Sequence, residues 1–109
     1  MIYTSYFANW RKFPKDLKQV SIALYPPKSF ENELLELAPT QKLLSDFKMQ
    51  RITIEEYTKE FNQQLAKLNP QDVKDNCILL CYEKSTDFCH RHLVRQWLNE
   101  NNIKCEELV

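Results

Sequence analysis

The sequence predicts a small α/β sandwich with a short, largely parallel sheet of about four strands flanked by helices. Segments rich in β-branched, aromatic or apolar residues alternate with segments of helical periodicity, and no hairpin signal joins one predicted strand to the next. With 109 residues, of which 43% are hydrophobic and 28% charged, the composition is that of one globular domain covering residues 1–109.

Four segments are predicted as strands. Residues 2–7 are aromatic and β-branched, and residues 20–25 are apolar at nearly every position until two prolines end them. Residues 77–82 are apolar on both alternating faces, which places this strand centrally in the sheet. Residues 103–109 are expected to form a last short strand.

Helices are expected over residues 39–48 and from Ile54 to about Leu68, with a short one within residues 29–37. Thr53 begins a capping box, because Glu56 follows three residues later and can reach back to the Thr53 amide.

A last helix over residues 89–98 is expected to use Asp87 or Thr86 as its N-cap. The chain contains no glycine, so neither a dinucleotide-binding fingerprint nor a nucleotide-triphosphate loop is present. Asparagine must therefore supply positive φ angles, and Asn101–Asn102 is expected to end this helix.

A candidate site lies between residues 77 and 98, which contain three of the four cysteines and both histidines. Cys81 and Glu83 fall at the C-terminal end of the predicted strand, the edge where open α/β sheets bind ligands. A helical wheel puts Cys89 and His90 on the sheet-facing side of the first helical turn, with the next residue at the border. The predicted site consists of Cys81, Glu83, Cys89, His90 and Arg91.

The residues alone leave the chemistry of this site open. A thiol in a first helical turn beside histidine and arginine gains thiolate character, which a nucleophile requires. The backbone amides there, together with Arg91, also make an anion site. Cys81, Cys89, His90 and Glu83 are an acceptable zinc set, although their spacing is not that of compact zinc motifs. In a purely structural role, the cysteines would be small buried residues.

A second feature is the loop over residues 8–15, in which basic and aromatic side chains alternate. One interpretation is a patch that binds a phosphate-bearing or planar ligand. The other is a loop held against the core by Trp10 and Phe13, with its cations facing water. The formal net charge of +0 argues against a whole surface devoted to nucleic acid. A local patch that binds nucleic acid or a protein, using Trp10, Arg11, Lys12 and Lys15, stays open.

No apolar run approaches the roughly 18 residues needed to span a bilayer. The residues after Met1 lack the charged and then apolar pattern of a secretory signal. We therefore expect a cytoplasmic protein with reduced cysteines rather than a disulfide framework, and with no membrane contact. The sequence indicates no cofactor.

The run Leu79–Lys84, followed by Asp87–Val94, resembles the domain of unknown function 488 family in its short, single-domain branch. The segments Tyr3–Asn9, Val20–Ala23 and Leu37–Pro39 resemble the same family, so the resemblance covers essentially the whole chain. It implies a compact α/β fold and a shared Cys-x-Glu…Cys-His-Arg site, and it implies no known activity. It also leads us to expect an arginine near the end of the second strand.

This chain has Leu24 followed by Tyr25 at that place, so anion binding is weaker or rests on Arg11 and Arg91. Our leading hypothesis is an enzyme-like pocket, in a thiol-dependent enzyme, for an anionic small molecule or nucleotide. Cys89 or Cys81 would be the thiolate, and His90 or Glu83 the acid or base. The expected ligand-binding residues are Asn9, Arg11 and Arg91. The alternatives are a binding module without catalysis and a structural zinc domain.

Overall fold

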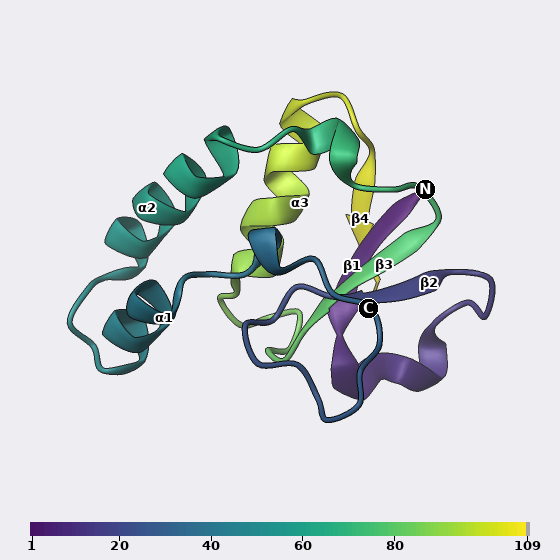
Figure 1. Cartoon of the computed structure of the whole chain (residues 1–109), viewed down its shortest axis with the longest axis horizontal. Coiled ribbons are helices and arrows are strands. Elements are labelled where there is room, and N and C mark those ends of the chain that lie inside the picture. Colours follow the sequence, from purple (N-terminus) through teal and green to yellow (C-terminus); the bar gives the residue numbers. More distant parts are fainter. Residues whose placement is uncertain (109) are drawn as a thin grey trace.

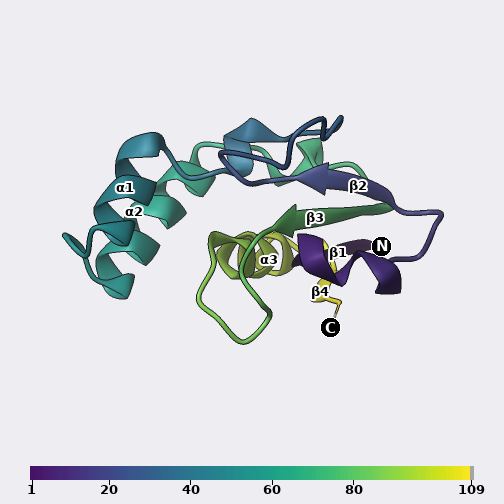
Figure 2. The same ribbon diagram turned by 90° about the horizontal axis from the view of Figure 1, so that it is seen from below.

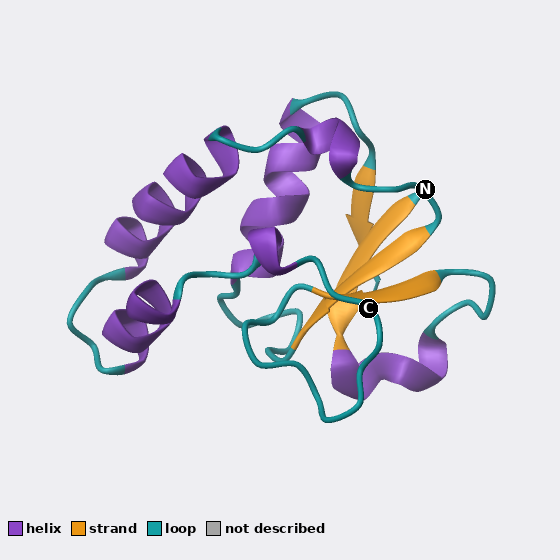
Figure 3. Ribbon diagram, in the orientation of Figure 1, coloured by secondary structure: helices purple, strands orange, loops and turns teal. Residues whose placement is uncertain are grey.

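The computed structural model describes residues 1–108, which form a four-stranded parallel sheet beside a group of helices (Figures 1 and 3). The strands are β1 (Ile2–Tyr6), β2 (Lys18–Ser21), β3 (Cys77–Cys81) and β4 (Cys105–Glu107). Their order in the sheet is β2-β3-β1-β4, and every pairing is parallel. The predicted α/β class is therefore confirmed. Val109, the end of the predicted fourth strand, lies outside the described residues.

Both views place α3 between the sheet and the pair formed by α1 and α2 (Figures 1 and 2). None of the described helices has the length and apolar character needed to cross a bilayer. The α-helices are α1 (Gln41–Lys48), α2 (Ile54–Ala66) and α3 (His90–Glu100). The 3-10 helices are η1 (Phe7–Lys12), η2 (Leu35–Leu37) and η3 (Pro70–Asp72).

Strand β3 is central in the sheet, as predicted, and all five of its residues are buried. Its first four side chains alternate between two apolar clusters, and Cys81 packs with Ala23 and Cys89 in a third. Leu79 packs with Phe61 of α2 and Val94 of α3 in the main core, whereas Ile78 packs with Phe13 on the other face. That second face is covered by η1 and the chain around it rather than by an α-helix, so the α-helices flank the sheet on one side only.

Strand β2 occupies residues 18–21, whereas the sequence predicted a strand over residues 20–25. The difference arises because β2 is an edge strand, where Lys18 can pair with β3 and still be exposed. Ile22 is fully buried and its amide donates to Leu80 O at 2.9 Å, but the chain then leaves the sheet. Burial therefore explains the apolar residues Ile22 and Ala23, whereas Tyr25, at the end of the predicted strand, is exposed.

The predicted helix α2 begins as expected. The Thr53 hydroxyl accepts from the Glu56 amide at 3.1 Å, and the Glu56 carboxylate accepts from the Thr53 amide at 3.0 Å, which completes the capping box. The helix ends at Ala66, two residues before the predicted end. Asn102 adopts a positive φ of 63° just after α3, so asparagine replaces glycine there as expected. The wider expectation that asparagine supplies the positive φ angles is wrong, because Ser29 and Gln50 also adopt them.

The predicted N-cap of α3 is wrong, because Cys89 and not Asp87 or Thr86 precedes the helix. Asp87 donates its amide to Lys84 O at 3.0 Å, so this segment forms a separate turn. Cys89 is extended, with φ −154° and ψ 145°, and its side chain caps no backbone amide. Its sulfur is consequently directed to other partners.

Candidate functional site

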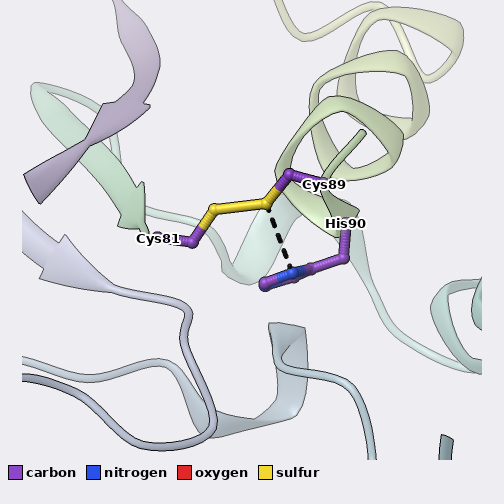
Figure 4. A group of neighbouring side chains, drawn as sticks. All are labelled: Cys81, Cys89 and His90. Atoms are coloured by element: carbon purple, nitrogen blue, oxygen red, sulfur yellow. Dashed lines mark hydrogen bonds between the residues drawn. A yellow bond between two sulfur atoms is a disulfide. The ribbon is translucent and has the colours of Figure 1, made fainter. Parts of the chain in front are cut away.

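The C-terminal edge of the sheet brings the end of β3 next to the start of α3. Cys81 is the last residue of β3, and Cys89 is the N-cap residue of α3. Both side chains are buried, and Figure 4 shows them directed at each other with His90 beside them. Their two sulfurs and a ring nitrogen of His90 all lie within 4.8 Å of one another. The fold thus gathers three of the predicted site residues at one point.

The four cysteines divide into two pairs. The sulfurs of Cys81 and Cys89 are joined in a disulfide (Figure 4), which differs from the expectation that the cysteines are unbonded. Cys77 and Cys105 are free and lie in the core. Burial raises the pKa of Cys77 to about 11 and that of Cys105 to about 12, so both stay protonated at neutral pH. Only Cys81 and Cys89 lie at the C-terminal edge of the sheet, whereas Cys77 and Cys105 are the first residues of β3 and β4.

The tautomer of His90 follows from its backbone partner. Its Nε2 lies 2.6 Å from the carbonyl oxygen of Ile22, which can only accept, so Nε2 carries the proton. Nδ1 then keeps its lone pair and lies 3.6 Å from the Cys89 sulfur. Burial lowers the pKa of His90 to about 4, and the charge of Arg91 acts in the same direction. The ring is therefore neutral at pH 7, and its Nδ1 can accept a hydrogen bond.

Arg91 is completely buried, and its guanidinium is bonded to groups of the protein itself. Its Nη1 donates to the Cys81 sulfur at 3.0 Å and to the Glu83 carbonyl oxygen at 2.9 Å. Its Nε and Nη2 donate to the two carboxylate oxygens of Glu107 at 3.1 and 2.8 Å. A cation that donates to a sulfur stabilises the thiolate form of that sulfur once it is reduced.

Glu107, at the end of β4, is a site residue that the sequence did not indicate. Thr4 and Ser85 donate hydroxyl hydrogen bonds to its carboxylate at 2.5 and 2.6 Å, in addition to the two from Arg91. Burial alone would raise its pKa, but these hydrogen bonds outweigh burial and lower it. The one signal in the sequence was Arg91 itself, because a buried arginine requires a carboxylate partner.

Glu83 lies beyond the end of β3, which stops at Cys81, and its side chain is exposed. Its Oε2 is 3.7 Å from the Cys81 sulfur, so the loop keeps it beside that residue. It is also near enough to Tyr57 to contribute, after burial, to the raised pKa of that phenol. The Tyr57 hydroxyl therefore stays protonated and able to donate.

A cavity of about 450 Å³ opens beside Cys89 and His90, between α1, α2 and the start of α3. This volume is within the usual range for small-molecule sites. One wall is a cluster of three aromatic rings, Phe47, Tyr57 and Phe88, whose centroids are 5.1 to 5.4 Å apart. The other lining residues are Leu44, Lys48, Gln50, Ile52, Ile54 and Glu83.

A second cavity, of about 100 Å³, adjoins Cys81. It shares Leu44, Lys48, Glu83 and His90 with the larger cavity, so the two cavities adjoin each other. Leu24 is part of its lining. The position at which the resemblance predicted an arginine is therefore next to the site, and it is occupied by an apolar side chain.

The other predicted ligand-binding residues lie outside the linings of these two cavities. Asn9 is buried, and its amide nitrogen donates to Ser5 Oγ at 3.1 Å and to the carbonyl oxygen of Leu108 at 3.2 Å. Arg11 is exposed and its guanidinium lies 5.2 Å from the ring centre of Trp10. Trp10 is 60% exposed and does not pin η1 to the core, whereas Phe13 is buried as expected.

The comparison with known protein families places the chain in one of them. A family model described as the active DUF488-N3 subclade matches residues 4–102, which include every predicted site residue. Neither a curated protein nor a solved structure matches the chain. Because the matched region is most of the sequence, the chain belongs to the DUF488 family.

Proposed function

We propose that this protein is a thiol-dependent enzyme that acts on a small molecule carrying an anionic group. The observation that carries this proposal is the Cys89 sulfur, which faces the unprotonated Nδ1 of His90 at the edge of a 450 Å³ cavity. A nucleophile, an imidazole held in the tautomer that can accept a hydrogen bond from it and a space for substrate are therefore adjacent.

Cys89 is the proposed nucleophile. In the reduced protein its thiol can donate a hydrogen bond to His90 Nδ1, because Nε2 already donates to Ile22 and the ring is neutral. Burial lowers the pKa of His90 to about 4, so the ring is a weak base that orients the thiol rather than one that takes its proton. The sulfur also lies at the N-terminus of α3, where the helix dipole favours a negative charge and therefore the thiolate.

Cys81 is the proposed partner thiol. Arg91 donates to its sulfur at 3.0 Å, and this cationic donor favours the thiolate. Because its sulfur and that of Cys89 can join, the pair forms a disulfide when oxidised and must be reduced before Cys89 can attack. The description of the matching subclade as active supports an enzyme over an inert binding module.

Lys48 is the proposed contact for the anionic group of the substrate. It lines both cavities, whereas Arg91, which the sequence favoured for this role, is paired with Glu107. The wall formed by Phe47, Tyr57 and Phe88 suits a planar or apolar part of the same molecule, such as the base of a nucleotide.

Two alkylating agents of similar size test this proposal at pH 7. Iodoacetate is anionic and iodoacetamide is neutral, and peptide mass spectrometry of the reduced protein reports modification of each cysteine. We expect Cys89 to react faster than Cys77 and Cys105. For Cys89, the ratio of the iodoacetate rate to the iodoacetamide rate should fall roughly fivefold in Lys48→Gln. The lost ammonium charge, at about 4 Å, contributes about 1 kcal/mol in water.

Lys59→Gln is the matched control, because Lys59 is exposed on α2 and is not among the cavity residues. It should leave the ratio unchanged. If Cys89 reacts no faster than the two core thiols, the thiol proposal is wrong. A ratio that Lys48→Gln does not change contradicts the role given to Lys48.

A further inference from the structure

We infer that the reduced protein binds one zinc ion through the sulfurs of Cys81 and Cys89 and the Nδ1 of His90. The ion withdraws both thiolates and the imidazole beside them from reaction, so it acts as a reversible inhibitor. The metal site rests on geometry alone, and its inhibitory effect rests on the function proposed above.

The three donor atoms are already gathered. All lie within 4.8 Å of one another, and all three residues are buried. Donors of a tetrahedral zinc site with bonds of about 2.3 Å are roughly 3.8 Å apart, so small side-chain rotations suffice. The Cα atoms of Cys81 and Cys89 are 7.8 Å apart. This backbone spacing leaves room for an ion between the sulfurs after reduction.

The hydrogen bond from His90 to Ile22 is a second, independent observation. Histidines that bind metals usually donate their other ring N–H to a carbonyl or carboxylate, which fixes the ring and directs the free nitrogen to the ion. His90 does this through Nε2, at 2.6 Å from the Ile22 carbonyl oxygen. Its free nitrogen points toward the Cys89 sulfur (Figure 4).

The charges also balance. Two thiolates and a neutral imidazole balance the charge of Zn²⁺. The zinc-bound cluster is therefore neutral, which favours it in a buried site. Arg91 lies beside Cys81 and would repel a cation, but its ion pair with Glu107 offsets that charge. The remaining coordination position is open to a water molecule, because Cys89 and His90 line the 450 Å³ cavity.

Zinc binding and nucleophilic attack exclude each other, since both use the lone pairs of the same atoms. The ion displaces the protons of the two thiols into solvent and forms two zinc–sulfur bonds, with no change of oxidation state. A chelator reverses the reaction when the protons return. Oxidation to the disulfide removes two of the three donors and therefore also excludes the metal.

The test uses the full chain, reduced with a phosphine and freed of metal. Competition with a chromophoric chelator should show one Zn²⁺ per chain, and Co²⁺ should give a thiolate-to-cobalt charge-transfer band. Cys81→Ser, Cys89→Ser and His90→Asn should each weaken zinc binding by about 100-fold or more. Cys77→Ser is the matched control, because Cys77 is a buried cysteine outside the cluster, and it should bind like the wild type.

A measurement on the wild type avoids any effect of these variants on folding. One equivalent of zinc should protect Cys81 and Cys89 from alkylation, and a chelator should restore their reaction. Binding below one ion per chain, a cobalt spectrum without the charge-transfer band, or no protection of this pair would overturn the inference. So would wild-type zinc affinity in any one of the three ligand variants.

The two proposals fail in distinguishable ways. Fast alkylation of Cys89 at pH 7 in a protein that binds no zinc would support the proposed function and contradict the metal site. Stoichiometric zinc binding, with Cys89 still slow to react after the zinc is chelated, would support the metal site and contradict the proposed function.

Discussion

Arg91 and Glu107 form a bidentate ion pair that connects the first turn of α3 to the end of β4. The guanidinium is completely buried and the carboxylate is 13% exposed, with Nε–Oε1 and Nη2–Oε2 distances of 3.1 and 2.8 Å. The same guanidinium donates to the Cys81 sulfur. Strand β4, through Glu107, therefore holds the Arg91 guanidinium beside the Cys81 sulfur.

Glu107→Gln should destabilise the protein by about 2–3 kcal/mol, because it leaves the Arg91 cation buried without its partner. Urea unfolding measures this loss. Alkylation of Cys81 should also become slower at neutral pH, since Arg91 is no longer held against the sulfur.

Glu106→Gln is the control for this prediction. Glu106 is exposed and pairs with exposed Lys104 at 3.7 Å, so its loss should change stability by no more than about 0.5 kcal/mol. Equal effects of the two substitutions on Cys81 would show that Glu107 does not position Arg91.

Acidification should destabilise the protein through His90. The ordinary pKa of 6.5 applies to the unfolded chain and about 4 to the folded one, so between these values the unfolded state binds the extra proton. The contribution of His90 is therefore fully present above pH 6.5 and is lost as the pH falls toward 4, by at most about 1.4 kcal/mol per pH unit.

Urea unfolding at several pH values between 4 and 7 checks this prediction. The carboxylates also titrate in acid, so the relevant quantity is the difference between the wild type and His90→Gln. That difference should shrink as the pH falls. A difference that stays constant would mean that His90 titrates normally in the folded protein.

Thr53→Ala should cost about 1 kcal/mol, because it removes the hydroxyl that accepts from the Glu56 amide at the start of α2. The loss matters for the site, since α2 supplies Tyr57 to the cavity wall and Phe61 beneath the His90 ring. Thermal or urea unfolding measures it. Thr58→Ala, within the same helix, should not destabilise, because alanine has the higher helix propensity. Equal losses from both substitutions would contradict a capping role for Thr53.

Much of the site could be predicted because its signals are local in the sequence. Cys81 ends a strand whose alternation is readable, and Cys89 and His90 begin a helix whose periodicity is readable. The general rule that parallel strands bind ligands at their C-terminal edge then predicts that these residues meet. The capping box at Thr53 is local in the same sense.

Glu107 could not be predicted, because it reaches Arg91 only through the pairing of β4 with β1 and lies 16 residues away in the sequence. The cavity wall is likewise assembled from α1, α2 and the residue before Cys89, and no single segment records that packing. Asn9 was expected to bind ligand, and its amide nitrogen donates to Ser5 and Leu108 within the fold, contacts that also depend on how the chain folds.

The most direct test of the central claim is the pH dependence of alkylation for all four cysteines in the reduced, folded wild type, followed by peptide mass spectrometry. Cys89 and Cys81 should reach half of their maximal rates below about pH 7.5, the range of activated thiols. Burial raises the pKa of Cys77 to about 11 and that of Cys105 to about 12, so these two should stay unreactive throughout. If Cys81 and Cys89 react only at the alkaline pH that the core thiols require, the site is not a thiol centre.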